Sequence, residues 1–91
     1  AILVNSVAIL EVLKRNSAMC GDRCRAAAGL SLGEYTAHVS AGSMAFPDAV
    51  RLVYRRGMFM QEACNTNPGG MVSIIGLADE KVDQLCAEMK L

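Results

Sequence analysis

Hydrophobic positions recur along the chain at the spacing of α-helices. The opening stretch, residues 1 to 15 (AILVNSVAILEVLKR), is apolar on nearly every side, which predicts a helix packed on several faces. Helices are also predicted over 32–41, ended by Gly42, and over 47–63, with Pro47 in the first turn. A last amphipathic helix is indicated by the spacing i, i+3, i+4, i+7 of Val82, Leu85, Cys86 and Met89.

Two short apolar runs between these helices predict strands. Residues 25–29 (RAAAG) and 71–76 (MVSIIG) have the length and apolar character of buried strands, although alanine is a poor strand former. The resulting order of helix, strand, helix, helix, strand, helix favours an α/β architecture. The turn-forming cluster NTNPGG at 65–70 is the best candidate for a boundary, so we expect one subdomain over 1–64 and the start of another over 65–91.

The composition points to a piece of a larger fold. With 91 residues the chain holds at most one domain, yet 53% of its residues are hydrophobic, more than so short a chain buries easily. Nine basic residues balance nine acidic ones and only four residues are aromatic, so we expect no nucleic-acid partner. The opening apolar run is far shorter than the ~20 residues of a membrane span and lacks signal-peptide features, so we expect no membrane association and no secretion.

Four cysteines raise the question of a metal site. Cys20 and Cys24 have a spacing that suits zinc, but no second close pair follows and His38 is the only histidine. We therefore expect free thiols, as in a reducing compartment, and no metal.

A candidate nucleophile lies in the sequence Gly29-Leu30-Ser31-Leu32-Gly33. This is the G-x-S-x-G pattern of a nucleophile elbow, in which a sharp turn from strand to helix exposes a serine. The pattern explains the glycines, because side chains two positions either side of the serine would collide across the turn. The N–H of Leu32, at the start of the helix, can bind an oxyanion. The alternative is a tight turn with an incidental serine.

A serine needs a base, and His38 is poorly placed to be one. It follows Ser31 by seven residues, which on a helix separates them by ~10 Å along the axis. We therefore interpret His38 as structural and expect the base to come from outside this chain.

Arg56 is the second candidate site residue. On a helical wheel for 47–63 it falls among apolar residues, whereas Arg51 and Arg55 fall on the charged side. A guanidinium facing a core requires an anion, because an unpaired buried charge is costly. Arg56 is therefore either half of an internal ion pair or the receptor for an acidic group of a substrate.

The stretch GLSLGEYTAHVSAGSMAFPDAVRLVYRRGMFMQEA resembles the malonyl-CoA:acyl carrier protein transacylases of type II fatty acid synthesis. More loosely, it resembles the acyltransferase domains of polyketide and fatty acid synthases. The resemblance implies a hydrolase-like α/β large subdomain and the start of a ferredoxin-like small one. It implies that Ser31 takes malonyl from coenzyme A and passes it to the phosphopantetheine thiol of acyl carrier protein, with no cofactor. It also implies that Leu32 helps bind the oxyanion and that Arg56 holds the malonyl carboxylate.

The chain departs from the family at the residue before the serine. Most members have histidine there and this chain has Leu30, which borders the acyl pocket and puts acyl preference in doubt. A leucine is more typical of plastid members, so we expect a bacterial cytoplasm or a plastid stroma. Because the family's catalytic histidine and second oxyanion donor are missing, we expect these 91 residues alone to be inactive. Three alternatives remain: a polyketide-type acyltransferase, a serine hydrolase, and a non-catalytic piece that binds another chain.

Overall fold

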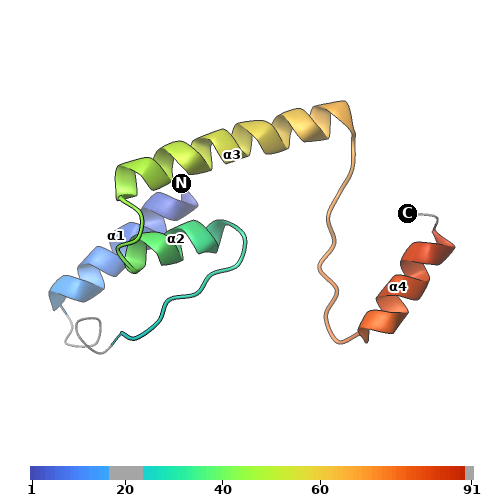
Figure 1. The fold of residues 1–91 in the computed structure, drawn as a ribbon, viewed down its shortest axis with the longest axis horizontal. Helices are drawn as coiled ribbons and strands as arrows, with labels where there is room; N and C mark the ends of the chain where they lie inside the picture. The colour runs from blue at the N-terminus through green and yellow to red at the C-terminus, as the bar shows by residue number, and fades with distance from the viewer. Residues whose placement is uncertain (17–23, 90–91) are drawn as a thin grey trace.

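The structure, a computed structural model, describes residues 1–16 and 24–89, which form four α-helices. The helices are α1 (Ile2–Asn16), α2 (Leu32–Ser40), α3 (Phe46–Thr66) and α4 (Asp79–Glu88). Helices α1, α2 and α3 contact one another, whereas α4 packs against none of them and follows an extended connection (Figure 1). The radius of gyration is 17.8 Å, well above the value of about 12 Å expected for a compact chain of this length. The four predicted helices are confirmed, with α3 ending at Thr66 rather than at residue 63.

The two strands and the α/β fold class predicted from the sequence are wrong. The described residues contain no strand, and both predicted segments are irregular and exposed. The physical reason is that a strand exists only when its N–H and C=O groups pair with a neighbouring strand, and none lies beside either segment in the described chain. Gly76, with φ of 78°, also leaves the strand conformation at the end of the second segment. The described fold is helical, without a hydrolase-like sheet or a ferredoxin-like subdomain, and the boundary predicted after residue 64 stays a prediction.

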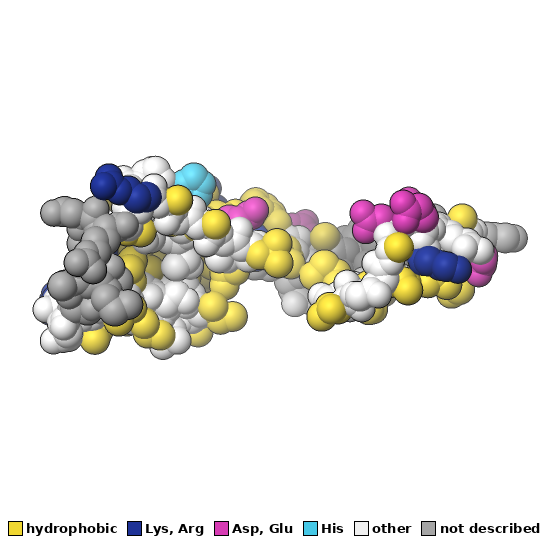
Figure 2. Space-filling view, turned by 90° about the horizontal axis from the view of Figure 1, so that it is seen from below, with side chains coloured by type: hydrophobic (Ala, Val, Ile, Leu, Met, Phe, Trp, Pro, Cys, Tyr) yellow, Lys and Arg dark blue, Asp and Glu magenta, His cyan; other side chains and the backbone are white. Residues whose placement is uncertain are grey.

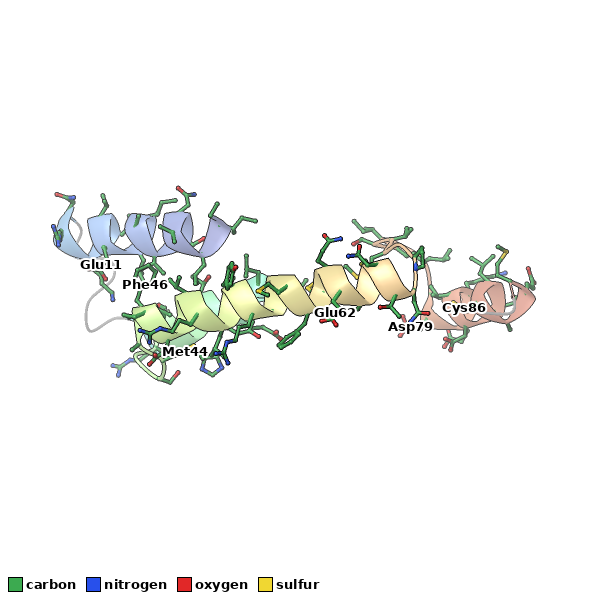
Figure 3. The ribbon with its side chains drawn as sticks, turned by 90° about the horizontal axis from the view of Figure 1, so that it is seen from above. Glu11, Met44, Phe46, Glu62, Asp79 and Cys86 are labelled. Atoms are coloured by element: carbon green, nitrogen blue, oxygen red, sulfur yellow. The ribbon has the colours of Figure 1, made fainter. Side chains whose placement is uncertain are left out.

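A small core lies where the first three helices meet. Leu3 and Val7, one turn apart on α1, and Ala49 on α3 are the buried hydrophobic residues, with exposed fractions of 2%, 8% and 0%. The partly buried residues around them come from α2, its C-terminal loop and α3: Tyr35, Val39, Met44 and Val53. Figure 3 shows one end of α1 beside the beginning of α3, where Phe46 lies, with Met44 just before it. This junction holds α2, and the serine at its N-terminus, against α3.

Replacing Ala49 with leucine should destabilise the junction. Because Ala49 is fully buried between helices, three extra carbon atoms have no room, and overpacking of this kind costs about 1–3 kcal/mol. The matched control is Ala63→Leu on the exposed distal part of the same helix, which should change the melting temperature little. Thermal unfolding of both variants, followed by circular dichroism, tests the difference, and equal melting temperatures would contradict the tight junction.

The end of α2 has a specific capping geometry. Gly42 has φ of 75°, and its N–H donates to the carbonyl of Val39 at 3.1 Å while the N–H of Ser43 donates to that of His38 at 3.0 Å. This pair of hydrogen bonds is a Schellman motif, which requires a left-handed residue where glycine stands. The prediction that Gly42 ends this helix is confirmed.

Much of the apolar composition remains on the surface. Figure 2 shows hydrophobic side chains spread over both the helical cluster and the α4 region. Leu30, Met71 and Ile75 are each at least 90% exposed, and the loops that carry them are exposed throughout their described lengths. Among the described helices, none combines the length and the apolar character that crossing a membrane requires.

Candidate active site

Ser31 has the most unusual backbone of the described chain. Its φ of 56° and ψ of −113° make it the one described residue other than glycine with a positive φ. Backbone conformations of this sparsely populated kind cost on the order of 1–3 kcal/mol and are concentrated at functional sites. Ser31 immediately precedes α2 and is exposed, so the turn presents its hydroxyl on the surface at the helix N-terminus.

The two glycines around Ser31 are not equivalent. A Cβ on Gly29 would lie 2.0 Å from the carbonyl oxygen of Gly33 and 2.6 Å from the nitrogen of Glu34. Both are backbone atoms that cannot move aside without moving the turn. A Cβ on Gly33 would meet nothing within 4 Å in the described structure. The prediction that both positions exclude a side chain is therefore right for Gly29 and wrong for Gly33. The backbone approaches the Cβ position of Gly29 closely but leaves the Cβ position of Gly33 open.

The first turn of α2 leaves a backbone donor beside the serine. The N–H of Gly33 donates to the carbonyl of Leu30 at 3.0 Å, and that of Glu34 donates to the carbonyl of Ser31 at 3.2 Å. The N–H of Leu32 has no backbone acceptor within the described ranges, as expected for the first residue of a helix. A free N–H next to the nucleophile, at the positive end of the helix dipole, is suited to bind an anion.

The structure brings Arg56 to Ser31. Nη2 of Arg56 donates a hydrogen bond to Oγ of Ser31 at 2.7 Å, across 25 residues of sequence. Arg56 is half-buried, in agreement with its position on the inner side of the predicted helix. The tertiary contact exists because α2 and α3 pack together, which sequence spacing alone does not reveal.

Arg56 has no carboxylate partner in the described part of the chain. The ion pairs there join Lys14 to Glu11 at 3.5 Å and Arg51 to Asp48 at 2.9 Å. Of the two interpretations of Arg56, the internal ion pair finds no partner among these residues, and the receptor for an external anion stays a prediction. The catalytic and binding roles of Ser31, Leu32 and Arg56 stay predictions.

Leu30 lies directly before the serine and is 90% exposed. Its side chain makes almost no contact with the rest of the described chain, so it is free to contact an acyl group bound at Ser31. That contact stays a prediction as well.

His38 is engaged away from this site. Its Nδ1 lies 2.8 Å from Oγ of Ser43, which in turn donates to the carbonyl of His38 at 3.2 Å. If that hydroxyl proton points to the carbonyl, Nδ1 carries a proton and donates to Oγ. Sequence reasoning missed the role of Ser43, although its position just after the glycine that ends the helix was a usable signal. His38 thus acts at the C-terminus of α2, opposite the end that carries Ser31.

The described cysteines and a hollow along α3 lie outside the site. Cys24, Cys64 and Cys86 are free and exposed, Cys20 lies outside the described residues, and the described residues contain no cluster suited to hold a metal. A hollow of about 650 Å³ lies along the outer face of α3, lined by residues that include Arg55 and Phe59 but neither Ser31 nor Arg56.

Comparison with known proteins finds close relatives. The chain is 48% identical over 88 residues to a protein of Salmonella typhimurium named malonyl CoA-acyl carrier protein transacylase, covering 97% of this chain and 28% of that protein. It is 42% identical to the protein of the same name from Bacillus subtilis, covering 93% of this chain and 26% of that one. A human protein named malonyl-CoA-acyl carrier protein transacylase, mitochondrial, is 39% identical over 99% of this chain and 23% of its own length.

The chain thus spans about a quarter of the length of the curated relatives it matches. No family model matches it, and no solved structure does.

Proposed function

We infer that this chain belongs in sequence to the malonyl CoA-acyl carrier protein transacylase family. From that premise we propose that the complete protein transfers malonyl groups from coenzyme A to acyl carrier protein in fatty acid synthesis. The observation that carries the proposal is the contact between Arg56 and Ser31, at 2.7 Å. This contact puts the Arg56 guanidinium, which has no described carboxylate partner, beside the exposed hydroxyl of Ser31. A substrate with a thioester and a free carboxylate requires both groups, the hydroxyl to attack the thioester and the cation to bind the carboxylate.

In the proposed reaction Ser31 forms a covalent ester. Its Oγ attacks the thioester carbon of malonyl-CoA, a carbon–oxygen bond forms, the carbon–sulfur bond breaks, and coenzyme A leaves as its thiol. The phosphopantetheine thiol of acyl carrier protein then attacks the ester and frees the serine. The N–H of Leu32 stabilises the oxyanion of each tetrahedral intermediate. The base lies outside the described residues, and the reaction needs no metal or cofactor.

The proposed role of Arg56 is to hold the free carboxylate of the malonyl group. A guanidinium binds a carboxylate through two parallel hydrogen bonds, which fixes the plane and direction of the acyl chain. Fixing that end positions the thioester carbon for attack by the adjacent Oγ. An esterase for uncharged substrates has no use for this cation, so the Arg56 contact favours the transacylase over the serine hydrolase.

Replacing Arg56 with alanine should reduce malonyl transfer by about 100-fold or more, because the carboxylate loses a charge-assisted pair of hydrogen bonds worth about 3 kcal/mol. Transfer of an uncharged acetyl group should be spared or raised. The matched control is Arg55→Ala, since Arg55 is exposed and turned toward the outer face of α3. Transfer of labelled malonyl and acetyl groups to acyl carrier protein measures both activities. Equal losses for the two groups would mean that Arg56 is only structural.

Leu30, in place of the family's usual histidine, is proposed to set acyl preference and the rate at which water hydrolyses the ester.

A polyketide-type acyltransferase would differ in its acyl group and carrier. Comparison of malonyl with methylmalonyl transfer separates it from the malonyl transacylase. Localisation varies among the relatives, since the human one is named mitochondrial and the two bacterial ones are not.

A further inference from the structure

Arg56 contacts the nucleophile itself, in addition to any role in holding a carboxylate. The hydrogen bond from its Nη2 to Oγ of Ser31 is short, at 2.7 Å, and joins a cation to a neutral hydroxyl. No described carboxylate competes for the guanidinium. In the free protein, the guanidinium of Arg56 therefore has the Ser31 oxygen as its described hydrogen-bond acceptor.

Such a contact lowers the reactivity of the oxygen. A lone pair that accepts a hydrogen bond from a cation is less available to attack a carbonyl carbon. A contact present in the ground state and lost during attack raises the barrier by its own free energy.

A carboxylate is a better partner for the guanidinium than a hydroxyl. It carries a full negative charge and accepts two parallel hydrogen bonds, which a serine oxygen cannot do. A carboxylate bound end-on to the two terminal nitrogens of Arg56 accepts a hydrogen bond from Nη2, the nitrogen that otherwise donates to Ser31. The hydrogen bond to Ser31 is thereby replaced. The carboxylate also neutralises the charge that holds the hydroxyl.

We propose that Arg56 restrains Ser31 until a free carboxylate binds, so that the carboxylate of the acyl substrate releases the nucleophile that attacks it. This inference rests on the proposed function and deepens it. Selection for carboxylated acyl groups then occurs in the acylation step as well as in binding. An uncharged acyl group would meet a serine that is still restrained.

The test measures the reactivity of Ser31 toward an uncharged electrophile, with and without formate. The complete protein is mixed with 4-nitrophenyl acetate, and acetylation of Ser31 is followed by the first burst of 4-nitrophenolate and by intact-protein mass. Formate is a carboxylate too small to fill an acyl pocket, and chloride at equal ionic strength is the control. Formate should accelerate acetylation about tenfold, the factor that one hydrogen bond to a charged group represents.

The variant Arg56→Met keeps much of the stem and removes every donor. It should acetylate faster than the unmodified protein without formate, and formate should not change its rate. If formate leaves the unmodified protein unchanged or slows it, the restraint does not exist, and this result stands even if the variant fails to fold. A slower reaction of a folded Arg56→Met variant would overturn the inference as well.

Malonyl transfer to acyl carrier protein, measured on the same preparation, separates this inference from the proposed function. Normal transfer without activation by formate overturns the restraint alone. Activation by formate without malonyl transfer supports the restraint and overturns the proposed substrate.

Discussion

Replacing Ser31 with alanine should abolish malonyl transfer to acyl carrier protein, with a loss of at least about 10³-fold in the complete protein. The hydroxyl oxygen is the atom that forms the covalent bond, and in the proposed mechanism no other group takes its place. Transfer of a labelled malonyl group from coenzyme A measures the loss. Intact-protein mass should show a malonyl adduct on the unmodified protein after mixing with malonyl-CoA, and none on the variant.

Two further variants separate a catalytic serine from a structural one. Ser43→Ala removes a serine hydroxyl just beyond the opposite end of α2, the one that contacts His38, and should leave transfer nearly unchanged. Ser31→Gly should be as inactive as the alanine variant yet more stable, by about 1 kcal/mol, because glycine adopts a positive φ without strain. Labelled acyl carrier protein produced by either Ser31 variant would end the proposed mechanism.

Replacing Gly29 with alanine should disrupt the turn that presents the serine. The new Cβ would lie 2.0 Å from the carbonyl oxygen of Gly33, so the backbone must shift. We expect a loss of more than about 3 kcal/mol in the free energy of unfolding, at the severe end of single substitutions. A displacement of about 1 Å at the nucleophile should also cost about 100-fold in transfer. Thermal unfolding and malonyl transfer measure the two effects.

Gly33→Ala is the matched control, four residues away at the other glycine of the same motif. Nothing lies within 4 Å of its added Cβ in the described structure, and alanine is favoured over glycine in a helix by about 1 kcal/mol. This variant should keep its activity and be as stable as the unmodified protein or slightly more so. If the two alanine variants have the same stability and activity, the close backbone approach at Gly29 is not what maintains the turn.

The helices could be predicted well from the sequence because their signals are local. Gly42 ended α2 and Pro47 fell in the first turn of α3, as predicted, since both depend on backbone preferences of single residues. The strands could not be predicted in the same way. The runs at 25–29 and 71–76 have apolar character, but a strand depends on a partner that the run itself does not specify.

The candidate site shows the same division. The motif around Ser31 identified the serine, and the helical wheel put Arg56 on the inner side of its helix. Leu52 falls among the apolar residues on the same wheel, yet it is 45% exposed in the structure. The wheel could not say which group Arg56 contacts, because that group lies on another part of the chain.

The sequence by itself determined the helices, the glycine-flanked serine and the arginine, because each is encoded by residues close together along the chain. Only the tertiary structure decided that the chain forms no sheet within its described residues, that Gly29 is crowded whereas Gly33 is not, and that Arg56 donates to Ser31. The physical reason is the packing of α1, α2 and α3 around Leu3, Val7 and Ala49. That packing brings together atoms 25 residues apart, which no local preference can do.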